Sequence, residues 1–287
     1  MTNTPSPMPQ WNQATIVGVG LIGGSIGLAM RARGLAKSIV GVGRNEASLA
    51  DALNVGAIDR AATDIADGVK EADLVIICSP VDKIVHLVQE VDRHCPSGTI
   101  VTDAGSTKEA ITTALQDGLT NARFVGGHPL AGGAKAGPKH ADACLYVGRT
   151  VVLTPTEQTD QAAAAAVEDL WTALGATVVC MQPHEHDEAL AFTSHLPHWA
   201  AAAVAATTPE QWLPLTATGW YDTTRIAAGD AALWRQIFTS NRGHVLKALD
   251  KFEKVLAALR EALETEDDAK LEKLLNDGKN RRDAVGN

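Results

Sequence analysis

Residues 15–25 read Thr15-Ile16-Val17-Gly18-Val19-Gly20-Leu21-Ile22-Gly23-Gly24-Ser25. The apolar run at the start is typical of a buried strand, and it passes through glycines into a helical pattern. Gly18, Gly20 and Gly23 have the spacing G-x-G-x-x-G, which brings a dinucleotide pyrophosphate to a helix N-terminus. We therefore predict that this loop, including Leu21 and Ile22, binds a dinucleotide cofactor. A glycine-rich turn without a ligand is the alternative.

The choice of dinucleotide depends on the residues that follow the second expected strand, residues 38–42. An Asp or Glu is expected there, about 20 residues after the glycines, to bind the ribose 2′-hydroxyl and to repel a 2′-phosphate. The sequence has Gly43 and Arg44 instead. A guanidinium pairs well with a phosphate, so Arg44 favours NADP, with NAD as the second choice. Alternatively, Arg44 is an ordinary surface residue and Glu46 binds the ribose.

The first half of the chain alternates short apolar runs with longer amphipathic segments. This pattern predicts a parallel sheet covered by helices. Ser79 and Pro80 end one of the strands, and we include both in the expected cofactor site. The expected strands are residues 15–19, 38–42, 74–78, 99–102, 124–126, 150–153 and 176–181, and the expected helices are residues 22–33, 46–54, 82–91, 107–116 and 160–174.

The character of the chain changes near Pro183. Beyond this point there is no convincing strand pattern, and residues 185–195, 199–206, 231–258 and 267–275 suit helices. We therefore predict an α/β protein with two domains. A Rossmann-type parallel-sheet domain that binds NAD(P) spans residues 1–182, and an all-α domain spans residues 183–287.

Composition narrows the function classes. The 287 residues carry a net charge of −9, which argues against nucleic acid as a partner. The four cysteines show no CxxC pairing, as is typical of a reducing compartment. No uncharged apolar run reaches the roughly 18 residues of a membrane span, and residues 1–10 lack the apolar core of a secretory signal. We therefore expect a cytoplasmic protein without a membrane partner.

Two loops that follow expected strands carry candidate catalytic residues. Ser106 lies in Asp103-Ala104-Gly105-Ser106-Thr107-Lys108, at the strand edge that faces the ligand crevice in open α/β sheets. It suits a hydrogen bond to a substrate hydroxyl or to nicotinamide, or the capping of the next helix. His128 lies in Gly126-Gly127-His128-Pro129-Leu130-Ala131-Gly132. A histidine in such a rigid loop is a candidate general base, and a purely structural histidine is the alternative.

Polar clusters in the second half suit a substrate pocket. The segment His184-Glu185-His186-Asp187 lacks the His-Glu-x-x-His spacing of a zinc site, so we expect no metal. Asp187 and His195 fall near one helix face and His198 follows them, which indicates a polar pocket or a core network between helices. Arg225 lies among small and apolar residues, where a partly buried arginine needs a carboxylate or phosphate. Trp234 suits a pocket wall or ordinary packing.

Together these motifs resemble the prephenate/arogenate dehydrogenase family of tyrosine biosynthesis. The resemblance extends from residue 15 to about residue 240, in the order of the family. The combination of His-Pro-Leu-Ala-Gly and Ser-His-Leu-Pro-His is specific to it. The matching stretches are residues 18–25, 103–108, 127–132, 194–198 and 224–226, with Trp234.

The resemblance implies a Rossmann domain followed by a helical dimerisation domain, and it implies oxidative decarboxylation of a cyclohexadienol dicarboxylate. By this analogy His128 accepts the proton of the ring C4 hydroxyl, while hydride passes from C4 to the nicotinamide. Ser106 would position the hydroxyl, and Arg225 would bind a substrate carboxylate. Residues that would line or support the pocket are His195, His198, Asp187 and Trp234.

Other functions remain open at this stage. A β-hydroxyacid dehydrogenase of similar layout would use a lysine on the helical domain, for which Lys247 and Lys251 are candidates. A non-catalytic NADP-sensing protein would bind the cofactor without turnover. In every case the alanine- and leucine-rich second half has more apolar surface than a small bundle buries alone, so we expect a homodimer.

Overall fold

The computed structural model describes residues 11–133 and 135–286, in which a six-stranded parallel sheet forms the first half. The strand order is β3-β2-β1-β4-β5-β6, so the chain leaves one edge after β3 and returns beside β1 as β4. This reversal of direction is the point at which doubly wound sheets bind dinucleotides. The strands are β1 Trp11–Val17, β2 Ala36–Val42, β3 Arg60–Ala62, β4 Leu74–Ile77, β5 Ile100–Asp103 and β6 Arg123–Val125.

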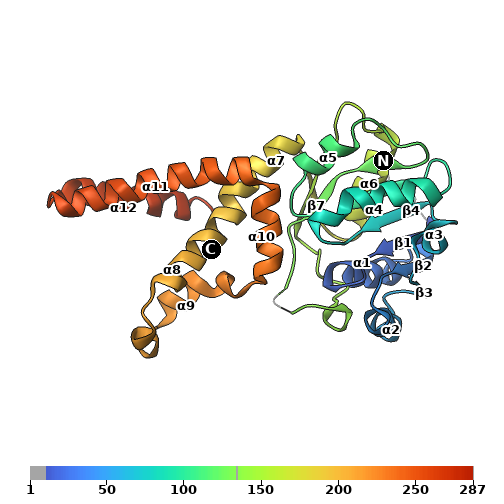
Figure 1. Cartoon of the computed structure of the whole chain (residues 1–287), viewed down its shortest axis with the longest axis horizontal. Helices are drawn as coiled ribbons and strands as arrows, with labels where there is room; N and C mark the ends of the chain where they lie inside the picture. Colours follow the sequence, from blue (N-terminus) through green and yellow to red (C-terminus); the bar gives the residue numbers. More distant parts are fainter. Residues whose placement is uncertain (1–10, 134, 287) are drawn as a thin grey trace, which may run out of the picture.

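Helices cover both faces of this sheet (Figure 1). Local signals position them: Asn45 caps α2 through a hydrogen bond from the Ser48 amide, and Gly34 follows the last turn of α1 with a φ of 64°. In α4, Val81, Ile84, Val88 and Val91 recur at helical spacing and are buried. The helices are α1 Leu21–Ala32, α2 Glu46–Asn54, α3 Ile65–Val69, α4 Val81–His94 and α5 Glu109–Leu115.

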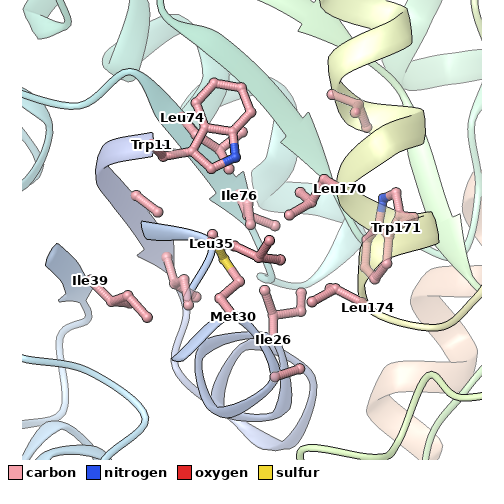
Figure 2. Close-up of a cluster of buried hydrophobic side chains, with 14 of the residues drawn as sticks. Trp11, Ile26, Met30, Leu35, Ile39, Leu74, Ile76, Leu170, Trp171 and Leu174 are labelled. Carbon is pink, nitrogen blue, oxygen red and sulfur yellow. The ribbon is translucent and has the colours of Figure 1, made fainter. Parts of the chain in front are cut away.

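Two apolar clusters lie on the two faces of the sheet. One joins β1 and α1 to helix α6 Gln161–Ala173, where Leu170 and Trp171 are fully buried beside Ile26 and Met30 (Figure 2). The other packs α3, α4 and α5 on the opposite face. Burying strands on both faces explains their nearly continuous apolar sequences.

A second, three-stranded sheet extends the first half. Strand β7 Gly127–Pro129 pairs antiparallel with β8 Thr150–Leu153, which pairs parallel with β9 Thr177–Cys180. The sequence patterns did not predict β3, α3 or β7. All three are short, and β7 exists only because its backbone pairs with β8, which begins at Thr150.

The second half is helical from Pro183, and the described residues beyond it contain no strand. A π-helical turn, Ala191–His195, joins α7 Pro183–Leu190 to α8 Leu196–Thr207. The prediction of one helix over residues 231–258 was wrong, because Asn241 separates two helices there. The remaining helices are α9 Thr218–Thr224, the 3₁₀ turns Glu210–Leu215 and Arg225–Ala228, α10 Ala231–Ser240, α11 Arg242–Glu264 and α12 Asp268–Asp283.

Helices α11 and α12 pack together and project away from the sheet (Figure 1). This half exposes large apolar side chains, including Leu215 at 73% and Leu263 at 65%. None of the helices in the described part of the chain has the length and apolar character needed to cross a bilayer.

Candidate active site

The glycine loop lies at the carboxyl ends of β1 and β4. Gly18 has a φ of 94°, a conformation that L side chains rarely adopt. A Cβ at Gly18 would lie 2.5 Å from the carbonyl oxygen of Cys78, and a Cβ at Gly23 would lie 2.5 Å from the carbonyl oxygen of Gly18. The close approach of neighbouring backbone therefore requires glycine at both positions.

The N-terminus of α1 is open at this edge. No side chain caps it, and its first turn holds no acidic residue. Among the described residues, none accepts a hydrogen bond from the backbone N–H groups of Leu21, Ile22 or Gly23. Free N–H groups and the positive end of the helix dipole attract an anion. The loop therefore fits a dinucleotide pyrophosphate.

Ser79 and Pro80 lie directly against this loop. The hydroxyl of Ser79 donates to the carbonyl oxygen of Val17 at 3.4 Å, and a Cβ at Gly18 would come within 2.9 Å of Ser79 Oγ. Pro80 is the residue that precedes α4. The β4–α4 loop thus borders the same edge as the glycine loop.

Arg44 follows Gly43 at the end of β2, and its side chain is exposed. No acidic residue in the described part of the chain pairs with it. The neighbouring Asn45 is engaged in capping α2. The guanidinium is thus available to a ligand at the position where the adenosine ribose of a dinucleotide would bind.

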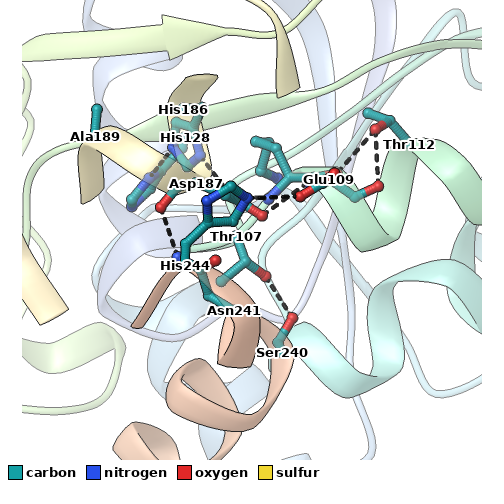
Figure 3. A network of polar contacts seen from close by, with 12 residues as sticks. Thr107, Glu109, Thr112, His128, His186, Asp187, Ala189, Ser240, Asn241 and His244 are labelled. Carbon is teal, nitrogen blue, oxygen red and sulfur yellow. Dashed lines mark hydrogen bonds and ion pairs between the residues drawn. The ribbon is translucent and has the colours of Figure 1, made fainter. Parts of the chain in front are cut away.

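His128, His186 and Asp187 form a hydrogen-bonded chain that we call the histidine chain (Figure 3). Nδ1 of His128 in β7 is 2.9 Å from Nε2 of His186 in α7, and Nδ1 of His186 is 2.7 Å from Oδ1 of Asp187. All three side chains are buried. The chain therefore joins the sheet half of the molecule to the helical half.

The carboxylate determines where the protons of the histidine chain lie. Because Asp187 can only accept, neutral His186 carries its proton on Nδ1 and has a lone pair on Nε2. That lone pair accepts from Nδ1–H of His128, which leaves Nε2 of His128 unprotonated. No described residue bonds to this nitrogen. His128 therefore presents a free proton acceptor.

The surroundings keep His128 neutral. Burial, and then the neighbouring His186, Lys108 and His195, hold the pKa of His128 well below the usual value for histidine. The imidazole is consequently the basic form throughout the neutral pH range. This is the state that a general base needs.

Asp187 is anchored on the sheet half of the molecule. Its two carboxylate oxygens accept from the backbone amides of Lys108 at 2.8 Å and Glu109 at 3.0 Å, at the N-terminus of α5. Burial alone would raise the pKa of Asp187, but the hydrogen bonds from His186 and these two amides lower it. The sequence pattern had placed Asp187 with His195 on a pocket face, whereas its carboxylate faces α5 and the histidine chain.

A buried ion pair connects the loop of Ser106 to His128. Lys108 Nζ pairs with Asp103 Oδ2, and both side chains are fully buried. The carboxylate of Asp103 also accepts from the backbone amides of Gly105 at 2.9 Å and Gly127 at 3.0 Å. Ser106 is half-buried within the loop that this carboxylate ties to β7.

The residues that follow His128 in the chain lie close to the glycine loop. A Cβ at Gly133 would lie 3.2 Å from the side chain of Leu21, the first residue of α1. The hydroxyl of Tyr146 donates to the carbonyl oxygen of Ile22 at 2.8 Å. Residues that follow His128 in the chain therefore pack against the start of α1.

The helical half supplies a wall of aromatic rings. The rings of His198 and Trp234 are stacked, with centroids 3.6 Å apart and planes inclined by 13°. The ring centroids of His195 and Trp234 are 6.3 Å apart, and the ring planes are inclined by 82°. Asn241, at the start of α11, donates to Nδ1 of His195 at 3.1 Å. The structure thus brings His195, His198 and Trp234 together.

Arg225 lies in the 3₁₀ turn Arg225–Ala228, which packs on α8. The expectation that it is partly buried was wrong, since its side chain is exposed and pairs with no described carboxylate. Directly after the turn, a Cβ at Gly229 would lie 2.7 Å from Nε1 of Trp234 and 3.2 Å from Cε1 of His198 in α8, so the chain runs close to these two rings there. The backbone of Arg225 thus lies among small and apolar residues of the sequence as expected, but its guanidinium is exposed.

Sequence reasoning missed His186 and Asn241. His186 was noticed only as a metal candidate, although its position beside Asp187 was a signal for a carboxylate–histidine pair. Asn241 gave no signal, because it lies inside a continuous helical pattern. Its amide reaches His195 and Asp187 because α11 packs against α7 and the π-helical turn.

Comparisons with known proteins agree with this architecture. Residues 26–180 match the family model described as prephenate dehydrogenase, nucleotide-binding domain, and residues 182–277 match prephenate dehydrogenase, dimerization domain. A prephenate dehydrogenase from Bacillus subtilis is 34% identical over 278 residues, which is 94% of this chain and 75% of the relative.

Solved structures extend the agreement to three dimensions. Prephenate dehydrogenase from A. aeolicus in complex with hydroxyphenyl propionate and NAD+ has a TM-score of 0.89 and 35% identity, covering 98% of this chain and 99% of that one. Arogenate dehydrogenase from Synechocystis has a TM-score of 0.82 and 30% identity, covering 95% and 99% of the two chains. The chain therefore belongs to the prephenate dehydrogenase family, in agreement with the resemblance of its motifs.

Proposed function

We propose that this protein oxidatively decarboxylates prephenate or arogenate in tyrosine biosynthesis, giving 4-hydroxyphenylpyruvate or tyrosine and carbon dioxide. The observation that carries the proposal is the histidine chain, which leaves a free proton acceptor on His128, five residues before the Gly133 that lies against the dinucleotide loop. The reaction needs one base, one hydride acceptor and recognition of a dianion. Its family relatives carry names for the same chemistry.

In this mechanism, Nε2 of His128 takes the proton of the C4 hydroxyl as the C4–O bond becomes a carbonyl. A nicotinamide held at the glycine loop would supply the acceptor for the hydride that leaves C4. Loss of the ring carboxylate as carbon dioxide returns its bonding electrons to the ring, which becomes aromatic as a phenolate at C4. The proton held by His128 then returns to this oxygen and gives the phenol. His186 and Asp187 stabilise the imidazolium that forms on His128, since the carboxylate faces the positive charge through His186. Ser106 orients the hydroxyl from the neighbouring loop.

Substrate binding is assigned to the helical half. His195, His198 and Trp234 form one wall of the pocket, and Arg225 binds a substrate carboxylate. We propose that the guanidinium acts in a homodimer, because it is exposed in a single chain and lies in a half that also exposes Leu215 and Leu263. The match of residues 182–277 to a dimerization domain supports this assignment. We also propose that the boundary between the two domains lies between residues 182 and 183.

For the cofactor we propose NADP in preference to NAD. Gly43 removes the acid that would repel a 2′-phosphate, and the exposed Arg44 provides a cation next to it. The cofactor-binding residues in this proposal are Gly18, Gly20, Leu21, Ile22, Gly23, Arg44, Ser79 and Pro80.

The test is an assay of four combinations, in which prephenate or arogenate is mixed with NADP or NAD. Turnover is monitored through the absorbance of the reduced nicotinamide. Turnover with NADP exceeding that with NAD is expected. Absence of turnover in all four, with NADP still bound, would favour a non-catalytic NADP sensor. The β-hydroxyacid dehydrogenase alternative predicts that a lysine variant abolishes turnover; Lys247 and Lys251 are both exposed, and Lys251 Nζ lies 4.7 Å from the Phe192 ring centroid.

A further inference from the structure

We propose that Asn241 is a positioning residue that holds His195 with its proton on Nε2, so that His195 donates a hydrogen bond to an oxygen of the substrate. This inference deepens the proposed function, on which its substrate contact rests. It adds a residue that the sequence did not single out and that touches neither the proton acceptor nor the cofactor loop.

The orientation of the Asn241 amide is determined by the backbone. Its Nδ2 is 2.7 Å from the carbonyl oxygen of Asp187, which can only accept a hydrogen bond. The side-chain nitrogen, and not the side-chain oxygen, must therefore face α7. Asn241 is 2% exposed, so water has little access to compete for these bonds.

The same nitrogen then determines the tautomer of His195. Nδ2 lies 3.1 Å from Nδ1 of His195, and its second hydrogen is free to make this bond. A donor requires an acceptor, so Nδ1 carries the lone pair and the proton of neutral His195 lies on Nε2. No described residue accepts a hydrogen bond from Nε2. His195 is thus left with one donor for a ligand.

The surroundings favour the neutral ring. His195 is 1% exposed, and burial lowers its pKa to about 4, against the opposing charge of Asp187. The ring centroids of Trp234 and Phe238 lie 6.3 and 6.5 Å from that of His195, in T-shaped arrangements. A protonated ring would donate from both nitrogens and would conflict with the Asn241 amide.

The fold brings these groups together through two irregularities. The π-helical turn Ala191–His195 adds a residue to the turn and directs His195 toward α11. The break between α10 and α11 places Asn241 opposite it. The Oδ1 atom of Asn241 is buried without a hydrogen-bond partner among the described residues, which costs folding free energy. The two hydrogen bonds of Nδ2 offset this cost.

His128 and His195 offer opposite hydrogen-bonding groups to a ligand. His128 presents a lone pair on Nε2, whereas His195 presents an N–H on Nε2. His195 lies near enough to affect the protonation of His128. A substrate that carries a hydroxyl to be deprotonated and a carboxylate or carbonyl to be anchored satisfies both nitrogens.

The direct test is ¹⁵N NMR of histidine-labelled protein at neutral pH, with the resonances of His195 assigned by their loss in a His195→Gln variant. We expect an unprotonated Nδ1 and a protonated Nε2. A proton on Nδ1, or a charged ring, would overturn the inference. This measurement uses the unmodified chain without substrate, so it stands whether or not the four-way assay detects turnover.

The substrate contact is tested by a pair of variants. Asn241→Asp replaces the donor by an acceptor of the same shape, so His195 must move its proton to Nδ1. The KM for the substrate should rise about tenfold or more, the loss of one hydrogen bond to a charged group, with a smaller change in kcat. The KM for NADP should not change. Asn280→Asp on exposed α12 is the matched control.

The His195→Gln background separates positioning from structure. A glutamine side chain has its own N–H₂ donor, so Asn241→Asp should alter KM less than twofold in that background. An undiminished effect of Asn241→Asp there would mean that Asn241 acts on the fold and not through His195, which would refute the proposal. If Asn241→Asp does not fold, the tautomer measurement decides alone.

Discussion

The glycine loop and the histidine chain are built in different ways. The loop uses backbone N–H groups from residues within one short stretch, and close backbone contacts require glycine at Gly18 and Gly23. The histidine chain uses side chains that are 58 residues apart, and it exists only where α7 docks on β7 and α5. Cofactor binding is therefore a local property of the sequence, whereas the base depends on the packing of the two halves.

Substitutions in the glycine loop and in the histidine chain should therefore impair different steps. Substitution of the base should remove turnover and spare cofactor binding. For His128→Asn we expect kcat to fall by about 10²- to 10⁴-fold, because general-base catalysis contributes that range. NADP binding, measured by fluorescence titration, should be unchanged. Turnover of prephenate or arogenate near the wild-type rate would remove His128 from its assigned role.

The anchor of the histidine chain should show a smaller effect of the same kind. Asp187→Asn keeps the shape of the side chain but removes the charge that orients His186 and stabilises an imidazolium on His128. We expect kcat to fall roughly a hundredfold, with a modest change in KM. A matched variant, Asp160→Asn, removes the carboxylate that caps α6, a helix that contributes no residue to the histidine chain. Equal losses in both variants would contradict the assigned role.

The loop side of the comparison is tested at the ribose end of the cofactor. Arg44→Ala removes the exposed cation without touching the glycines. The KM for NADP should rise about tenfold, the value of one hydrogen bond to a charged group, while the KM for NAD stays the same. Parallel kinetics with both cofactors measure this difference. If both constants change together, or neither does, Arg44 does not select the phosphate.

The smallest expected effect is the change of kcat/KM with pH. Burial lowers the pKa of His128, so the ring stays unprotonated to a more acidic pH than a histidine in water. A histidine with an unshifted pKa of about 6.5 would lose roughly fourfold in its basic form at pH 6. We expect kcat/KM to change less than about twofold between pH 7.5 and pH 6, with the acid limb lying lower. A limb centred near pH 6.5 would show that the base is exposed to water.

Much of the Rossmann-type half was predictable. Residues 46–54 and 150–153 form a helix and a strand with the predicted bounds, because a cap or a run of β-branched residues marks each of them. The three-residue strands β3 and β7 were missed, because no periodicity is visible over three residues and their partners in the sheets are distant. Such strands are products of pairing and not of local preference.

The candidate site follows the same division. His128, Ser106 and the glycines lie in loops with recognisable local signals, and those loops do converge. The exposure of Arg225 was not predictable, since the small residues around it in sequence do not reveal which side of a helical turn faces solvent. The break at Asn241 was equally invisible within an amphipathic pattern.

Local spacing and residue type were thus sufficient to identify a dinucleotide-binding sheet, a helical second half and the family's chemistry. The tertiary structure alone decided how the side chains are connected: His186 between His128 and Asp187, Asp103 between two loops, and Asn241 against His195. The physical reason is range. Turns, caps and glycine contacts depend on neighbours in the chain, whereas protonation states and tautomers depend on buried partners that only folding brings within hydrogen-bond distance.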